Sequence, residues 1–154
     1  KLATGVGGEK PTAVLTEQEI LNLQQVVRRM PVAEHVYAYA EKLVRVTRPK
    51  TSEALDFCKK WLTWGAGPRA VQYLILGAKA RAVLRGSYLV EVDDVNTVAE
   101  PVLAHRIITN FNAEADGVKP DHVIEALLKE IPVDGSSAPS AIASAFGSPG
   151  VSST

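Results

Sequence analysis

Apolar residues recur at helical spacing through most of the chain between residues 15 and 132. After Thr16, apolar side chains return at Ile20, Leu23 and Val27, which is the spacing of one face of a helix. Residues 16–19 read Thr-Glu-Gln-Glu, a capping box in which the threonine and the last glutamate bond to free N–H groups of the first turn. The pattern therefore predicts a helix that begins after Thr16 and ends before a proline at position 31.

A second apolar stripe predicts a helix over residues 32–46. Because the link to the first helix is short, the two helices are expected to pack antiparallel. Residues 54–64 predict a short, irregular helix that carries Trp61 and Trp64. Two tryptophans this close most often fill a core. Cys58 beside them is expected to be a small buried thiol.

Residues 68–85 are apolar at almost every angle around a helical turn, so a helix there would be buried on most of its sides. Gly86 is a usual residue for the C-terminal cap of such a helix. The rest of the chain predicts a helix that begins at Glu91 or Asp93, bends at Pro101 and continues to Ile108, then a polar loop at residues 110–119, and a last helix that opens at Pro120 and ends at Pro132.

These segments predict an all-α fold, a small helical bundle that occupies residues 15–132. Residues 1–14 contain three glycines and a proline without periodicity, which is typical of a flexible linker. Residues 133–154 are rich in serine, alanine, glycine and proline. Such a composition lacks the apolar residues needed for a core, so this low-complexity segment is predicted to be a disordered tail.

The charge balance and the cysteine count indicate which partners and which cellular compartment the protein has. The chain has 17 basic and 17 acidic residues, for a net charge of zero, which argues against nucleic acid or an anionic membrane as the main partner. Its single cysteine cannot form an internal disulfide and fits a reducing compartment. No apolar run approaches the ~20 residues that span a bilayer. We therefore expect a cytoplasmic protein without membrane insertion and without a nucleic-acid partner.

The most distinctive local pattern is the turn Gly65-Ala66-Gly67-Pro68-Arg69. Its glycines free the backbone, and proline has the φ of a first helical turn. An arginine in the first turn lies beside unpaired N–H groups and the positive end of the helix dipole, so Gly67, Pro68 and Arg69 are candidate ligands of a phosphate. The alternative is that the turn only caps a core helix and that Arg69 is solvated.

Other kinds of site find little support in the sequence. The three histidines, His35, His105 and His122, lie far apart and have no second ligand at helical spacing, so no metal site is predicted. Asp93 and Asp94 are adjacent, which makes their side chains diverge by about 100° on a helix and rules out a shared acid–base role. They are expected to favour the helix N-terminus electrostatically.

A DNA-binding helix-turn-helix over residues 68–104 is a weaker alternative. Arg81 and Arg85 would share one side of a helix, whereas Lys79 points away from it. The basic residues therefore do not form one continuous face of the kind that contacts DNA.

Six blocks of sequence, in order along the chain, resemble the C-terminal lid domain of the MoxR family of AAA+ ATPases. The blocks are residues 27–32, 39–49, 64–70, 76–82, 92–95 and 101–107. The resemblance covers Thr16 to about Pro132. It implies a parent ATPase in which a core with Walker motifs precedes this lid, ATP and Mg²⁺ are bound between core and lid, and subunits form a ring homo-oligomer.

The resemblance also implies roles for residues and partners. Arg69 matches the sensor-2 arginine, a catalytic residue expected near the γ-phosphate of ATP. The implied activity is chaperone-like remodelling or assembly of other proteins, often ones with von Willebrand factor A domains. Two positions depart from the family pattern: Gly67 stands where serine is usual, and Glu91 stands where threonine or serine is usual.

The 154 residues contain no Walker A or Walker B motif. We therefore expect the chain alone to be non-catalytic and to bind ATP very weakly. The alternative function is a stand-alone helical protein-interaction module that uses no nucleotide, and the helix-turn-helix DNA binder ranks third.

Overall fold

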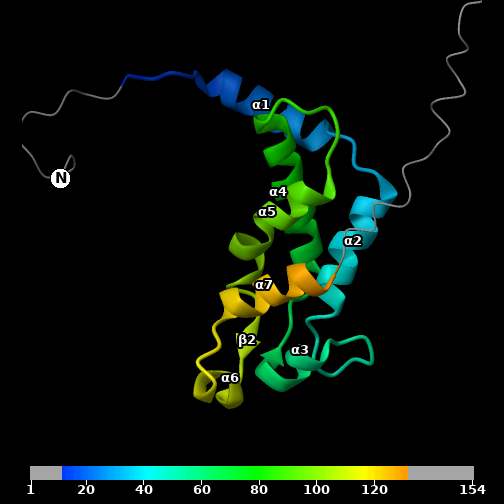
Figure 1. The fold of residues 1–154 in the computed structure, drawn as a ribbon. Helices are drawn as coiled ribbons and strands as arrows, with labels where there is room; N and C mark the ends of the chain where they lie inside the picture. The colour runs from blue at the N-terminus through cyan, green and yellow to red at the C-terminus, as the bar shows by residue number, and fades with distance from the viewer. Residues whose placement is uncertain (1–11, 132–154) are drawn as a thin grey trace, which may run out of the picture.

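The computed structural model describes residues 12–131 (Figure 1). Its elements are α1 (Glu17–Arg29), α2 (Glu34–Arg45), α3 (Asp56–Trp61), β1 (Leu62–Trp64), α4 (Arg69–Leu84), α5 (Val92–Leu103), β2 (Ile108–Thr109), α6 (Phe111–Ala115) and α7 (Pro120–Glu130). The predicted helical bundle is confirmed, with one two-stranded ribbon added to it. The predicted tail and all but residues 12–14 of the predicted linker lie outside the described residues.

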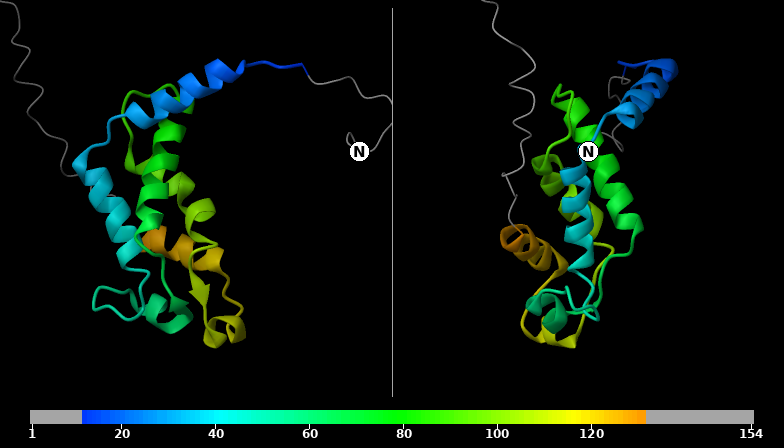
Figure 2. Two further views of the ribbon diagram at one scale, coloured as in Figure 1. Left: turned by 180° about the vertical axis from the view of Figure 1, so that it is seen from behind. Right: turned by 90° about the vertical axis from the view of Figure 1, so that its right-hand side faces the viewer.

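Helix α4 is the central element, and it packs against α5, α2 and α1. Figures 1 and 2 show α2 and α5 beside it, with α1 across one end and α7 lower in the bundle. A Cβ added at Gly77 would lie 3.3 Å from a methyl group of Val98, so glycine permits a close approach of α4 to α5. Burial is less complete than predicted, because Tyr73, Leu76 and Leu84 are exposed.

The first helix begins as predicted but packs differently. Thr16 and Glu19 form the capping box, with the backbone N–H of Thr16 donating to Glu19 Oε2 at 2.7 Å. The antiparallel pairing with α2 is wrong, because α1 crosses α4 instead (Figure 2). The link between α1 and α2 does not turn straight back, since Val32 forms a parallel β-bridge with Val90. No residue of α1 is buried.

The prediction of a two-tryptophan core plug is wrong. After Trp61 the chain becomes extended, so that Leu62 points into the core while Trp64 is 59% exposed. Trp61 is half-buried, and its indole N–H donates to the Asp116 carboxylate at 3.0 Å. Cys58 is fully buried, as predicted, and this burial raises the pKa of its thiol to about 12.

The second half of the chain departs from prediction in two places. Helix α5 ends at Leu103 and does not continue to Ile108, because Ile108–Thr109 pairs antiparallel with β1 as β2. The predicted polar loop contains α6, whose first turn is capped by Asn110. Helix α7 begins at Pro120 as predicted.

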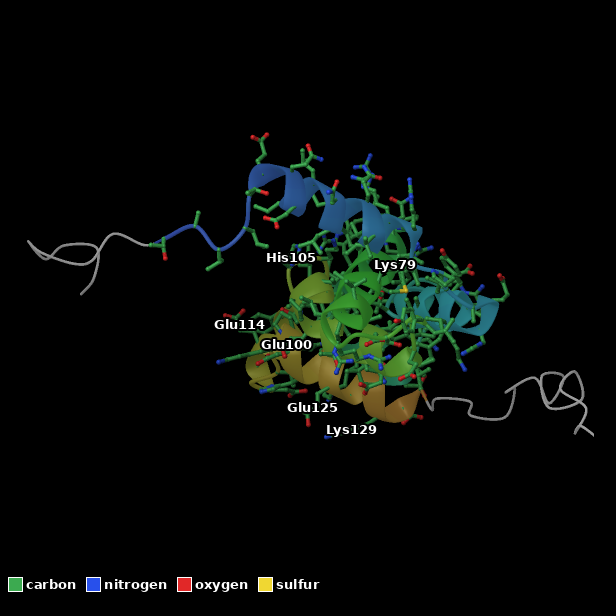
Figure 3. The ribbon with its side chains drawn as sticks, turned by 90° about the horizontal axis from the view of Figure 1, so that it is seen from above. Lys79, Glu100, His105, Glu114, Glu125 and Lys129 are labelled. Carbon is green, nitrogen blue, oxygen red and sulfur yellow. The ribbon has the colours of Figure 1, made fainter. Side chains whose placement is uncertain are left out.

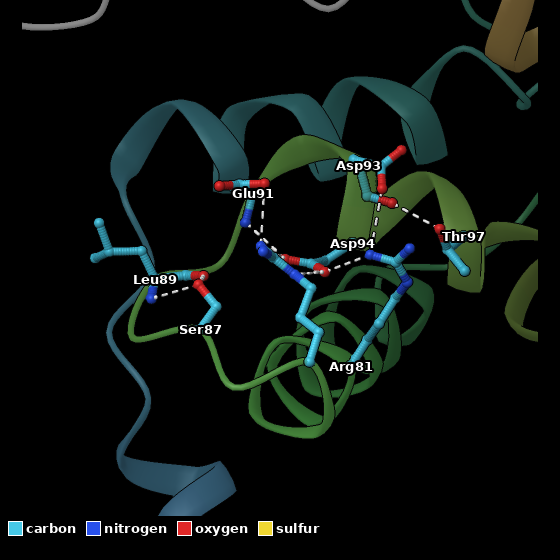
Figure 4. Close-up of polar contacts among 8 residues, drawn as sticks. Arg81, Ser87, Leu89, Glu91, Asp93, Asp94 and Thr97 are labelled. Carbon is cyan, nitrogen blue, oxygen red and sulfur yellow. Dashed lines mark hydrogen bonds and ion pairs between the residues drawn. The ribbon is translucent and has the colours of Figure 1, made fainter.

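A buried carboxylate joins α4 to the start of α5 (Figure 4). Asp94 is fully buried, and Arg81 donates to its Oδ1 at 2.6 Å. Arg85 donates to both carboxylate oxygens, at 3.0 and 2.9 Å, and the N–H of Glu91 donates to Oδ2 at 2.9 Å. Burial alone would raise the pKa of Asp94, but these hydrogen bonds outweigh it and lower the pKa to about 2. The carboxylate is therefore ionised at neutral pH.

The turn between these helices has the predicted cap. Gly86 has a φ of +73°, which suits glycine best. Its N–H donates to Val83 O at 3.0 Å, and the N–H of Ser87 donates to Ala82 O at 2.9 Å, the two bonds of a Schellman motif. The turn is thereby fixed, and it brings Glu91 and Asp94 back over the end of α4.

Candidate functional site

The predicted phosphate-binding turn leads directly into α4. Pro68 has φ −58° and ψ −30°, already helical, and Arg69 is the first residue of the helix. The N–H of Ala70 donates to Gly67 O at 2.9 Å, and the N–H of Val71 donates to Pro68 O at 3.1 Å. Gly67, Pro68 and Arg69 thus lie together at the positive end of the helix dipole.

Arg69 projects from this end of the helix into solvent. Its residue is exposed, and within residues 12–131 no side chain or carbonyl forms an ion pair or hydrogen bond with its guanidinium. An arginine carries its charge at any physiological pH and can bond two phosphate oxygens at once. The side chain is therefore available to an anionic ligand.

The turn that precedes Arg69 is hydrogen-bonded to the segment that follows α2. Ala66 is buried, its N–H donates to Thr47 Oγ1 at 2.9 Å, and its carbonyl accepts from Arg48 Nε at 3.2 Å. A Cβ added at Gly65 would lie only 2.3 Å from Thr47 O. The turn therefore rests directly on the backbone at the end of α2, and glycine at position 65 makes this approach possible.

A hollow of about 310 Å³ lies beside the turn, between residues 48–51 and 63–68. Lys50 lies over the exposed Trp64 ring, with Nζ 5.0 Å from the ring centre. Arg48 and Lys50 line the hollow, and so do Gly67 and Pro68, which lead into Arg69. An anionic ligand would be attracted to these basic side chains.

Sequence reasoning missed the residues that support the turn. Thr47, Arg48 and Lys50 precede the turn by some 15 residues, and nothing in their spacing predicts that the two segments meet. Glycine is not required at position 67 for steric reasons, because a Cβ added there meets no atom within 4 Å. A serine side chain would fit at that position.

The described residues do not form a metal site. In residues 12–131 no group of three or more His, Cys, Asp and Glu side chains is placed to hold a metal ion. The labelled residues of Figure 3 are spread over several elements, and only Glu125 and Lys129 share one, α7, where they pair at 2.6 Å. Lys79 donates to Arg28 O at 3.2 Å. These contacts are structural.

Two further features bear on the alternatives. Arg81 and Arg85 share one side of α4 as predicted, but both engage Asp94, so they do not present a free basic face to DNA. The part of the chain that the structure describes has no helix with the length and apolar character to cross a membrane.

Most of the chain is similar to known proteins in sequence and fold. Residues 57–127 match the model of the AAA lid domain family. Chaperone MoxR1 of Mycobacterium tuberculosis (strain ATCC 25618 / H37Rv) is 30% identical over 127 residues, which is 82% of this chain and 34% of MoxR1. The uncharacterized protein YeaC of Bacillus subtilis (strain 168) is 23% identical over 120 residues, or 78% of this chain and 35% of YeaC.

A solved structure shares both sequence and fold. The crystal structure of a candidate ATPase from Cytophaga hutchinsonii ATCC 33406 superposes with a TM-score of 0.70 at 30% identity, over 75% of this chain and 35% of that one. The chain thus spans about a third of the length of each of these three proteins.

The fold and the family match define the class of protein, a lid domain of the AAA+ type. Within that class, the similarities to MoxR1 and to the Cytophaga structure identify the chain as a MoxR-family lid domain, as the sequence resemblance predicted.

Proposed function

We propose that this chain is the lid of a larger MoxR-like ATPase, in which it closes over ATP and couples ATP binding and hydrolysis to the remodelling or assembly of other proteins. The observation that supports this most directly is Arg69, an exposed guanidinium without a partner among the described residues, held at a helix N-terminus by a rigid turn. In the proposed enzyme, Arg69 acts as the sensor-2 residue and, with Gly67 and Pro68, contacts the γ-phosphate.

The chemistry of ATP hydrolysis suits this arrangement. Water attacks the γ-phosphorus, the bond to the bridging oxygen breaks, and ADP and phosphate leave. An ATPase core would supply the Walker motifs and Mg²⁺, which neutralises phosphate charge when bound. Arg69 would hold γ-phosphate oxygens and stabilise negative charge as the phosphoryl group transfers. Loss of that group on hydrolysis would release the lid.

The proposed partners follow from this function. They are the ATPase core of the same protein, neighbouring subunits of a ring homo-oligomer, and client proteins, among which we include proteins with von Willebrand factor A domains. MoxR1 is named a chaperone, and we propose chaperone-like work for this protein as well. Dependence on ATP fits a location in the cytoplasm.

The test is the ATPase rate of the longer protein that joins this lid to its core. We expect Arg69→Ala to lower kcat about tenfold or more, equivalent to at least about 1.4 kcal/mol of transition-state stabilisation. Arg69→Lys should recover only part of the rate, because lysine lacks the planar, two-point contact.

Arg45→Ala is the matched control, because Arg45 is also a surface arginine but pairs with Glu41 and Glu53 at 3.5 and 2.8 Å. Its rate should equal that of the wild type. An unchanged rate for a folded Arg69→Ala protein would reduce the turn to a helix cap and contradict the sensor-2 role. A longer protein that never hydrolyses ATP would contradict the proposed function itself.

A further inference from the structure

We propose that Thr47 is a positioning residue for Arg69, acting through the backbone of the turn that precedes α4. This inference rests on the proposed function and concerns the same site. Thr47 is fully buried, at the point where the chain leaves α2. It lies 22 positions before Arg69 in sequence, and it acts on that residue through Ala66.

The hydroxyl of Thr47 both donates and accepts a hydrogen bond. It donates to Val44 O at 2.6 Å, within the last turn of α2, and it accepts from the N–H of Ala66 at 2.9 Å. One side chain therefore links the carboxyl end of α2 to the turn. Since the donor and the acceptor are fixed backbone groups, the hydroxyl defines where Ala66 lies.

Two neighbouring contacts hold the same backbone from other directions. Arg48 Nε donates to Ala66 O at 3.2 Å, so both polar groups of this buried residue are satisfied by side chains and not by secondary structure. Gly65 lies against the carbonyl of Thr47, leaving no space for a Cβ. The turn is thus held in one position by the end of α2.

The position of this turn sets the start of α4. Gly67 follows Ala66 directly, and its carbonyl accepts the first hydrogen bond of the helix, from Ala70. Arg69 lies between the two. A shift of Ala66 therefore moves the base of the Arg69 side chain, and misplacement of a catalytic group by about 1 Å is enough to slow a reaction strongly.

A consequence is that α2 and Arg69 move as one piece when the lid opens or closes. Thr47 and Arg48 directly follow α2, to which Thr47 is bonded through Val44 O, and Arg69 begins α4. A force on α2 from a neighbouring domain would reach the phosphate contact through these bonds.

The test uses Thr47→Val in the longer ATPase, because valine keeps the shape of threonine and removes only the hydroxyl. We expect kcat to fall about fivefold with KM for ATP nearly unchanged, and Thr47→Ser to restore most of the rate because serine retains the hydroxyl. Thr97→Val is the control, since Thr97 bonds only within α5, to Asp93 O at 2.9 Å. Its kcat should not change.

A double variant distinguishes a positioning effect on Arg69 from a general loss of activity caused by a disturbed fold. If Thr47 acts through Arg69, then Thr47→Val should have no further effect on kcat in an Arg69→Ala background. A loss of equal size in both backgrounds would overturn the proposal, as would a folded Thr47→Val protein with wild-type kcat. If Arg69→Ala itself leaves the rate unchanged, the proposed sensor-2 role fails first.

A milder variant keeps the proposal testable if Thr47→Val does not fold. Arg48→Met preserves most of the side-chain volume and removes the hydrogen bond to Ala66 O. Because Arg48 is only partly buried, this change should disturb folding less than a change at Thr47. It should lower kcat in the wild type and not in the Arg69→Ala background. Equal kcat values for folded Arg48→Met and wild-type proteins would contradict the anchoring of Arg69 through Ala66.

Discussion

Asp94→Asn is expected to lower the free energy of unfolding of the 154-residue chain by about 3 kcal/mol, because it breaks a buried, multiply bonded ion pair. The wild-type carboxylate accepts four hydrogen bonds, from Arg81, Arg85 and the N–H of Glu91. Asparagine has a single acceptor oxygen and would direct its own N–H groups toward the arginines. Urea unfolding followed by circular dichroism measures the loss.

Asp93→Asn is the matched control. Asp93 neighbours Asp94 and pairs with Arg81 at 3.2 Å, but its side chain is 72% exposed. Exposed ion pairs contribute between 0 and about 1 kcal/mol, so this variant should unfold almost as the wild type does. Equal losses for the two variants would show that the stabilisation is a general effect of charge and not of the buried contacts.

The same carboxylate predicts how stability changes in acid. The pKa of Asp94 is about 2 in the folded chain against an ordinary value of 3.8. Because the folded state binds this proton less readily, the stabilisation is complete above about pH 5 and is lost as the pH falls through 4 toward 2, by about 2 kcal/mol in total. In Asp94→Asn this part of the acid dependence should disappear, which unfolding at several pH values between 2 and 5 would reveal.

The parts of the fold that sequence predicted are those set by local chemistry. The capping box at Thr16, the glycine cap at Gly86 and the proline start at Pro120 each mark a helix end that the structure has. Such signals depend on residues within one or two turns. The β-branched Ile108 pairs with Trp64 of β1, 44 residues away in sequence, and so the helix predicted through Ile108 is wrong.

The residues of the candidate site likewise differ in whether local sequence predicts their role. Gly67, Pro68 and Arg69 are neighbours in sequence, so the turn could be recognised directly. Thr47 gives no local signal for its role. Its bond to Ala66 crosses a gap of 19 residues that contains α3 and β1, and no nearby residue marks that contact. The closeness of Trp61 and Trp64 in sequence predicts a core position for both, but the extended geometry of β1 places Trp64 on the surface beside the hollow.

Gly65→Ala is expected to destabilise the chain by about 3 kcal/mol, the upper end of the cost of overpacking. The added methyl would lie 2.3 Å from Thr47 O and 2.7 Å from Arg48 N. Both are backbone atoms, so no side-chain rotation relieves the overlap, and the turn must move away from α2. The displacement should also break the hydrogen bond between Ala66 and Thr47, which urea unfolding would record together with the steric cost.

Gly67→Ala supplies the comparison, since it makes the same chemical change two residues along the same turn. No atom lies within 4 Å of the added methyl, and φ at position 67 is outside the left-handed region. Alanine should be neutral or stabilise the chain by about 0.5 kcal/mol, because it restricts the unfolded state. A difference of this size between the two variants requires a turn pressed against the end of α2. If Gly65→Ala were as stable as Gly67→Ala, the turn would be free to shift, and neither Thr47 nor Arg48 could hold Arg69 in place.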